Sequence, residues 1–204
     1  MLIGKSRRGD TIVEVVLAFG VFTLVAVGTN ALMNRGVSLA EQSLEITLVR
    51  AQIDAQAELL RYARSVNSDA WSDITDHAKT AVGGAAIDEA NIPDLSTLTD
   101  CPSSAPQYSF MLNVTDDVLV FNRLDTAPTS AFYTPASVHS QFSASTDSPD
   151  TPAFSGIWVV PIRSVAVVAA ATVAYDMHIG TCWNVPGADR PFTLSTIVRL
   201  YDTP

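Results

Sequence analysis

The sequence predicts an α+β protein in which one long N-terminal helix packs on a C-terminal antiparallel sheet. Residues 10–66 contain no proline and repeat apolar residues at helical spacing, so one helix of about 57 residues, roughly 85 Å long, can form there. Beyond residue 107, segments rich in Val, Ile and aromatic residues alternate with turn-forming segments, which is typical of antiparallel strands. A helix followed by a run of strands defines this fold class.

The first half of the expected helix contains a long apolar run without charge. Residues 15–33 have no Asp, Glu, Lys or Arg, and they span about 28 Å at 1.5 Å per residue, close to the hydrocarbon core of a bilayer. Lys5, Arg7 and Arg8 precede the run, and such a positive flank predicts a cytoplasmic N-terminus with the rest of the chain outside. We therefore expect residues 10–33 to form a transmembrane segment.

Glu14 stands at the start of this run. A carboxylate at the edge of a bilayer core is costly, which indicates a functional role. Two other interpretations stay open: a plain signal anchor whose carboxylate reaches water, and a secretory signal peptide that is cut after the run. A secretory signal peptide usually has about 7–15 apolar residues followed by a small-residue cleavage site. This run is longer, and an amphipathic helix follows it.

Residues 9–15 read GDTIVEV and follow a basic leader, residues 1–9. This arrangement resembles the class III leader and cleavage motif of type IV prepilins and pseudopilins. The resemblance implies that prepilin peptidase, a membrane aspartyl enzyme, cuts between Gly9 and Asp10, so that Asp10 carries the new N-terminal amine and any methylation. It also implies that Glu14 aids assembly by pairing with that amine in a neighbouring subunit, which would offset the cost of a carboxylate in apolar surroundings.

Asp10 departs from the family pattern, which usually has Phe after the scissile glycine. A second acid beside the amine alters its local field, so the departure favours a minor pilin or pseudopilin and leaves methylation open. The implied partners are prepilin peptidase, other pilin subunits and assembly-platform proteins. The implied locations are the inner membrane before assembly and an extracellular filament afterwards. The alternative is a single-pass, membrane-anchored binding or adhesion domain outside the cytoplasm that does not polymerise.

The resemblance covers residues 5–33, and beyond them only the order of elements is similar to the pilin fold. Residues 34–66 form the amphipathic half of the expected helix and carry two apolar stripes. The broad stripe consists of Ala40, Leu44, Leu48, Ala51, Ala55, Leu59, Tyr62 and Val66. The narrow stripe consists of Ile46, Val49, Ile53 and Leu60. One stripe can pack on the chain's own sheet and leave the other for a partner, or one wrapped domain can cover both.

Residues 67–204 predict a globular, β-rich extracytoplasmic domain. A short helix is expected within 67–80, followed by a connecting loop over 81–107 and a hairpin of 108–114 with 118–122. A long exposed loop is expected over 125–155. After it come a bent strand over 156–160 and 163–175, which Pro161 breaks, and a last hairpin of 177–183 with 192–201. The Ala-rich part of 163–175 could alternatively be a short helix.

Cys101 and Cys182 are the two cysteines of the chain. Their spacing matches no metal motif, and a disulfide is chemically permitted if the domain lies outside the cytoplasm. Closing a loop of about 80 residues would stabilise the fold by roughly 4–5 kcal/mol in the chain-entropy model. The other interpretation is two separate buried thiols.

Charge and motifs argue against nucleic-acid binding and catalysis. The leader carries three positive side chains, so the chain from Asp10 onward has a side-chain charge of −12, with no basic stripe for phosphate binding. His77, His139 and His178 lie at no ligand spacing, and no hydrolase, nucleotide-binding or zinc motif occurs. We expect no cofactor, no metal and no enzymatic activity, with Asp116–Asp117 forming a turn.

Overall fold

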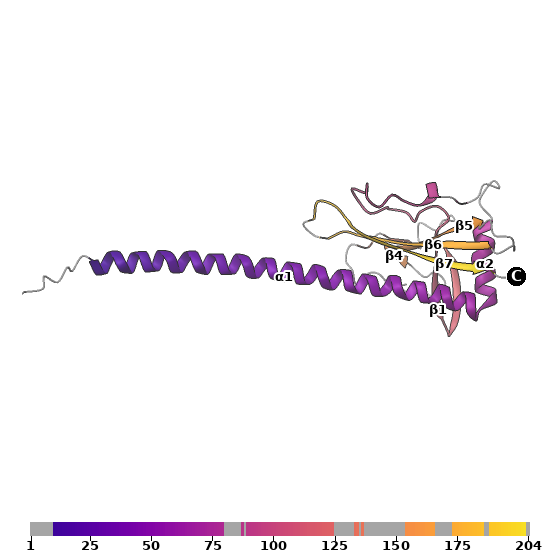
Figure 1. Cartoon of the computed structure of the whole chain (residues 1–204), viewed down its shortest axis with the longest axis horizontal. Helices are drawn as coiled ribbons and strands as arrows, with labels where there is room; N and C mark the ends of the chain where they lie inside the picture. The colour runs from indigo at the N-terminus through magenta and orange to yellow at the C-terminus, as the bar shows by residue number, and fades with distance from the viewer. Residues whose placement is uncertain are drawn as a thin grey trace, which may run out of the picture. The chain divides into compact units, whose positions relative to one another are not determined.

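The computed structural model describes residues 10–79, 87, 89–124, 133–134, 136, 154–165, 173–185 and 188–202. The chain divides into two compact units, Met1–Ile46 and Thr47–Pro204, which are described separately. The described helices are α1 (Asp10–Ser65), α2 (Ser68–Lys79) and the short 3-10 helix η1 (Glu89–Asn91) (Figure 1). The described strands are β1 (Phe110–Thr115), β2 (Val118–Arg123), β3 (Tyr133–Thr134), β4 (Phe154–Ser155), β5 (Ile157–Val165), β6 (Val173–Trp183) and β7 (Phe192–Asp202).

The predicted α+β class is confirmed, as are the long helix and the short helix that follows it. α1 ends at Ser65, and α2 begins three residues later. The side-chain Oδ1 of Asn67 accepts a hydrogen bond from the backbone N–H of Ala70 at 3.1 Å, the geometry of an N-cap. This cap starts α2 directly behind the end of α1.

Five strands form one antiparallel sheet in the order β2-β1-β5-β6-β7. Both predicted hairpins are confirmed. The first turns at Asp116 and Asp117, whose φ angles of 50° and 63° belong to the left-handed region that a two-residue type I′ turn requires. β6 and β7 pair over eleven residues, from Val173 with Asp202 to Trp183 with Phe192.

The prediction that Pro161 breaks a strand was wrong. β5 continues through Pro161, which pairs with Met177 of β6. Proline lacks an N–H and is tolerated where no neighbouring strand needs one. β1 is in register with β5 only at Phe110 and Val159, so the ladder on that side does not depend on Pro161.

Residues 163–175 do not form one strand either. Arg163 pairs with Tyr175, so the two ends of this segment belong to β5 and β6 and run antiparallel. The Ala-rich residues 166–172, for which a short helix was the alternative, lie outside the described residues. The same is true of most of the expected loop 125–155, in which the structure describes the two-residue parallel pair of β3 with β4 and the bridge of Ala136 to Trp183.

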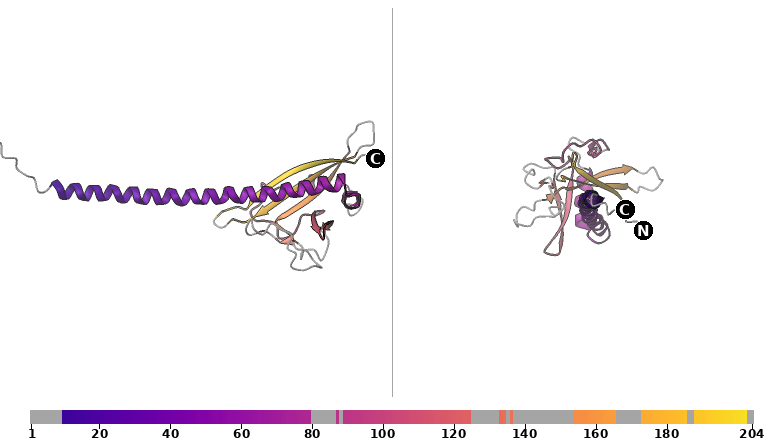
Figure 2. Two further views of the ribbon diagram at one scale, coloured as in Figure 1. Left: turned by 90° about the horizontal axis from the view of Figure 1, so that it is seen from below. Right: turned by 90° about the vertical axis from the view of Figure 1, so that its left-hand side faces the viewer.

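The helices cover one face of the sheet, and the segment with η1 lies on its other side (Figure 2). From α1, the buried residues are Val49, Ile53, Gln56, Ala57, Leu60 and Ala63. From α2, Trp71 meets Tyr175 of β6 edge to face, with ring centroids 5.8 Å apart. Successive strand residues face opposite sides. Tyr175, Met177 and Ile179 therefore face the helices.

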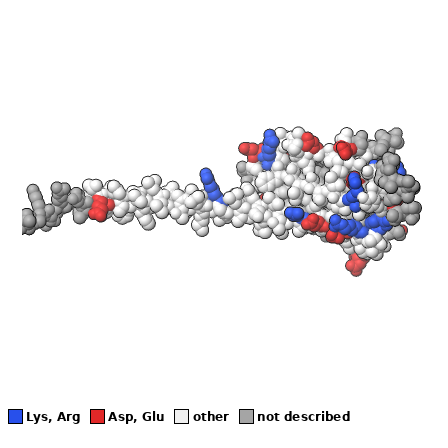
Figure 3. Space-filling model, viewed as in Figure 1, with Lys and Arg blue, Asp and Glu red and all other residues white. Residues whose placement is uncertain are grey.

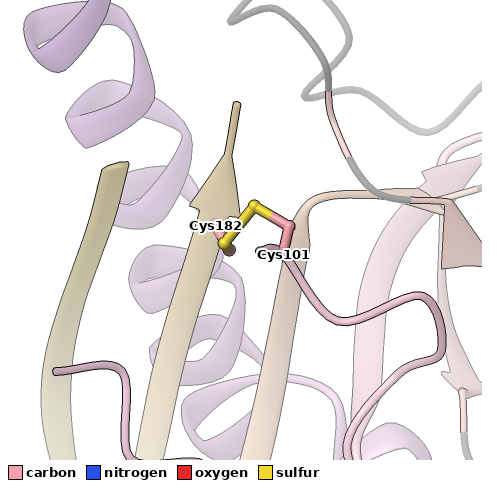
Figure 4. Close-up of a disulfide and its surroundings, with 2 residues drawn as sticks. All are labelled: Cys101 and Cys182. Atoms are coloured by element: carbon pink, nitrogen blue, oxygen red, sulfur yellow. A yellow bond between two sulfur atoms is a disulfide. The ribbon is translucent and has the colours of Figure 1, made fainter. Parts of the chain in front are cut away.

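On the opposite face, Cys182 of β6 is bonded to Cys101, with Cα atoms 5.5 Å apart (Figure 4). Cys101 belongs to the predicted connecting loop, whose described part contains only η1 as regular structure. Gly180 lies two residues before Cys182 on the same face. A Cβ on Gly180 would come within 2.7 Å of Nε1 of Trp158, so glycine leaves the room that this buried indole ring needs.

Gln56 joins α1 to the sheet by two hydrogen bonds. Its Nε2 donates to the carbonyl of Leu112 at 2.9 Å, and its Oε1 accepts from the N–H of Leu112 at 3.3 Å. Gln56 is only 8% exposed. The side chain thus satisfies both backbone groups of one β1 residue, where β5 offers no partner.

We predict that Gln56→Met lowers the free energy of unfolding of the globular unit by about 2–4 kcal/mol, because it leaves two buried backbone groups without partners. The matched control is Gln52→Met, at an exposed position one turn earlier in the same helix, which should change the free energy of unfolding by less than about 0.5 kcal/mol. Urea unfolding of the full chain in lipid nanodiscs, followed by tryptophan fluorescence, measures both. Equal effects of the two substitutions would contradict the role given to Gln56.

Candidate functional site on the N-terminal helix

The structure places part of the predicted processing site. Lys5, Arg7, Arg8 and Gly9 lie outside the described residues. α1 begins at Asp10, the residue expected to become the new N-terminus. Glu14 lies just over one helical turn further on, and its side chain is exposed. Cleavage and amine pairing therefore stay predictions.

The apolar part of α1 satisfies its own polar groups. The hydroxyls of Thr23 and Thr29 donate to the carbonyls of Gly20 and Val25 at 2.9 and 2.8 Å. The side-chain amide of Asn30 donates to the carbonyl of Ala26 at 3.4 Å. A helix whose backbone and side-chain groups are paired internally needs no water, which is the condition for crossing a bilayer.

By length and composition, α1 is the one described helix that could span a membrane. An 18-residue window of it reaches a mean hydropathy of 2.3. No charged residue lies between Glu14 and Arg35 in the sequence. The face of the helix drawn in Figure 3 accordingly has a long stretch without acidic or basic residues. The expectation of an apolar segment long enough to span a membrane is confirmed at this level. The orientation of this segment in a membrane stays a prediction.

The two stripes of α1 have different surroundings. Three members of the narrow stripe fall in the globular unit, Val49, Ile53 and Leu60, and each of them is at most 2% exposed. The broad stripe is left uncovered in the same unit: Leu48, Tyr62 and Val66 are 43%, 49% and 68% exposed. Leu59 is the one member that packs partly against the core. Within the globular unit, the domain therefore buries the narrow stripe and leaves most of the broad stripe exposed, and a partner for the broad stripe stays a prediction.

The predicted disulfide partners, Cys101 and Cys182, are bonded to each other. Among the described residues no group of three or more His, Cys, Asp or Glu side chains could hold a metal ion. Asp116 and Asp117 form the hairpin turn. His77 is buried, and its Nε2 lies 2.9 Å from the carbonyl of Tyr108, so this nitrogen carries the proton that it donates.

Asp176 and His178 lie two residues apart on β6 and therefore share one face of the strand, on the side away from the helices. Asp176 accepts two hydrogen bonds from Arg199 of β7, at 2.6 and 2.7 Å, and these bonds lower the pKa of its carboxyl group below the ordinary value of 3.8. Partial burial lowers the pKa of His178 below its ordinary value of 6.5, and the charge of Asp176 opposes this shift. His178 is therefore mostly neutral at neutral pH.

Sequence reasoning missed two residues on which the structure depends. Gln56 lies between members of the narrow stripe, where a polar residue on a buried face was the available signal. Gly180 interrupts an otherwise regular strand pattern, and a glycine inside a strand often marks a close approach. The sequence also gave no sign that the segment around Asp94 would lie against β6 and β7.

Comparisons with models of protein families, with curated proteins and with solved structures find no match to this chain. The assignment of a function therefore rests on the residues and the geometry.

We predict that the globular unit loses stability as the pH falls, in two steps. The pKa of His178 is lower in the folded chain than its value of 6.5 in the unfolded chain, so protonation favours the unfolded state. The stability that this difference contributes is fully present above pH 6.5 and is lost as the pH falls from 6.5 through the folded pKa. Below pH 3.8, the loss of the Asp176 charge adds a second decrease, because its folded pKa is also lowered. Thermal unfolding of the full chain in nanodiscs at pH 7.5, 5.5 and 3.5 measures both steps.

The matched variant is His178→Gln, which keeps a polar side chain but cannot titrate. The difference in melting temperature between this variant and the parent should shrink from pH 7.5 to pH 5.5. A constant difference would show that His178 does not cause the first step.

Proposed function

We propose that this chain is a structural subunit, of the minor pilin or pseudopilin kind, of a type IV pilus-like filament. The observation that carries the proposal is the organisation of α1. A glycine and an acid five residues later stand at the start of an uninterrupted helix, Asp10–Ser65. That helix is apolar in its first half and presents an uncovered apolar stripe in its second half.

The uncovered stripe supports packing between subunits. An extended row of exposed apolar side chains on a helix is unusual for a monomeric domain, and such surfaces mark interaction sites. Its partner has to be long, helical and apolar in order to cover a single stripe along several turns. The same helix from adjacent copies has this shape and composition, and a filament provides adjacent copies.

In this proposal, the apolar half of α1 first holds the subunit in the membrane and then forms the interior of the filament. Prepilin peptidase removes residues 1–9, and Glu14 pairs with the amine of Asp10 in a neighbouring subunit. The globular unit, Thr47–Pro204, lies outside the cytoplasm, where the Cys101–Cys182 disulfide is stable.

We predict that the mature protein begins at Asp10 and that Glu14→Ala is processed normally but is incorporated poorly into filaments. The reason is that cleavage needs the leader and Gly9, whereas assembly needs the carboxylate to neutralise an amine in apolar surroundings. Intact-mass measurement of the membrane fraction and of filaments sheared from the surface gives the mature N-terminus and shows whether the variant is incorporated into filaments. The control is Glu41→Ala, which removes an exposed acid from the same helix.

A mature chain that starts at Met1, or a Glu14→Ala variant found in sheared filaments at the parent's level, would contradict the proposal. A start at Met1 would instead favour a membrane-anchored binding domain that does not polymerise. A start beyond residue 33 would indicate a secreted domain.

We predict further that Leu48→Glu and Tyr62→Glu abolish incorporation into filaments without unfolding the globular unit. Both side chains are exposed, so the new charges cost little in the monomer but would be buried between helices in an assembly. The matched control is Ser65→Glu, which adds the same charge at an exposed position off the stripe. Shearing assays measure incorporation, and thermal unfolding verifies the fold. Normal filament levels in both stripe variants would exclude the stripe as the contact surface.

A further inference from the structure

A cleft lies on the face of the sheet that the helices do not cover. One wall is the turn of Pro93, Asp94 and Ser96, and the other consists of His178 of β6 with Ser195 and Ile197 of β7. We name it the loop–strand cleft. Its volume is about 290 Å³. This is near the lower limit of the roughly 300–1,000 Å³ typical of small-molecule sites, so the cleft has room for one small ring and not for an extended chain.

The strand register explains why these side chains meet. Ile197 is paired with His178 and Ser195 with Gly180, so all of them face away from the helices. Trp158 of β5 is paired with Gly180 and forms the base of the cleft, where it is 2% exposed. The cleft floor is therefore part of the rigid sheet.

The loop wall is also held in place. Oδ1 of Asp94 accepts hydrogen bonds from the backbone N–H of Ser96 at 3.0 Å and from its hydroxyl at 2.6 Å. The carbonyl of Asp94 accepts from the N–H of Thr97 at 3.3 Å and from its hydroxyl at 3.0 Å. The disulfide of Cys101 ties the same loop to β6. A wall fixed in this way loses little freedom when a ligand binds.

The polar groups of the cleft can best be matched by a ligand that has both hydrogen-bond donors and hydrogen-bond acceptors. Asp94 only accepts, and among the described residues its second oxygen, Oδ2, has no hydrogen-bond partner. Ser195 both donates and accepts, and a neutral His178 has one donor and one acceptor. Ile197, 59% exposed, adds an apolar surface at the rim. A suitable ligand thus combines hydroxyl groups with an apolar face.

Charge narrows the class of ligand further. Among the described residues that line the cleft, Asp94 and His178 are the only ones with an acidic or basic side chain. An anion would be repelled by Asp94 and would find no lysine or arginine among these described lining residues. A metal ion would find one carboxylate, one oxygen of which is already hydrogen-bonded, and no cluster of ligands. A cationic side chain would leave the donors of His178 and Ser195 without acceptors.

We propose that the loop–strand cleft binds one neutral pyranose ring, free or as the terminal residue of a glycan. The hydroxyls of the ring donate to Asp94 and exchange hydrogen bonds with Ser195 and His178, while its C–H face lies on Ile197. This proposal does not rest on the filament function, since the cleft contains no residue of α1.

The test is saturation-transfer NMR on the full chain in lipid nanodiscs, which avoids sugar-based detergents. The probes are glucose, galactose and N-acetylglucosamine with their methyl glycosides, beside glycerol and N-acetyl-arginine methylamide as comparators. We expect transfer to the ring protons of at least one sugar at about 10 mM, in the range of weak, millimolar binding. Equal signals from a sugar and its methyl glycoside identify a glycan end as the ligand, and loss of signal on methylation identifies the free sugar.

Asp94→Asn keeps the shape of the turn and an acceptor for Ser96, and it should weaken sugar binding about tenfold. Ile197→Ser should weaken it as well. The matched control, Asp116→Asn, changes an exposed acid of the β1–β2 turn outside the cleft and should leave binding unchanged. No transfer to any sugar, equal transfer in Asp94→Asn, or transfer only to the arginine probe would overturn the proposal.

Discussion

The pair of hydrogen bonds between Gln56 and Leu112 is the interaction on which the arrangement of the globular unit depends. β1 is joined to β2 along its whole length but to β5 at a single residue pair, so its inner edge needs another partner. The amide of Gln56 supplies both a donor and an acceptor there. Since a buried amide has one favourable orientation, these bonds fix the rotation of the helix about its own axis.

That rotation decides what the helix leaves exposed. With Gln56 directed at β1, the residues on the same side of α1, Val49, Ile53 and Leu60, contact the sheet. The broad stripe, which includes Leu48 and Tyr62, must then face away from the sheet. Burying the larger apolar surface inside the monomer would have been the more stable choice for an isolated domain. Its exposure is the physical reason for proposing a partner.

Much of the fold could be predicted from local patterns. The long helix, the short helix that follows it, the Asp116–Asp117 turn and the last hairpin depend on neighbouring residues, and all of them were predicted. The failures are non-local. The path of β5 through Pro161 depends on where β1 separates from β5, and the fit of Gly180 depends on the ring of Trp158 from another strand. The choice between the two stripes likewise depends on β1.

The candidate sites likewise differ in whether they depend on local or on distant residues. The processing segment is contiguous, so its residues can be read in one stretch of sequence, although cleavage itself is an event that no fold displays. The loop–strand cleft joins residues about 80 to 100 positions apart, from the Asp94 turn to β6 and β7, and no spacing in the sequence reveals it. The disulfide between Cys101 and Cys182 brings these distant segments together, because it holds the loop against β6 four residues from His178.

The two faces of the sheet therefore differ in the features that they present. The helix side contains the contacts that set the exposed stripe, and the other side contains His178, Asp176 and the cleft. On the second side, partial burial lowers the pKa of His178 below its ordinary value of 6.5, so acidification adds charge there, whereas Gln56 on the helix side has no titratable group. A chain built in this way can bind a ligand on one face while the other face keeps its packing, which is compatible with the proposed contact of its helix with neighbouring copies.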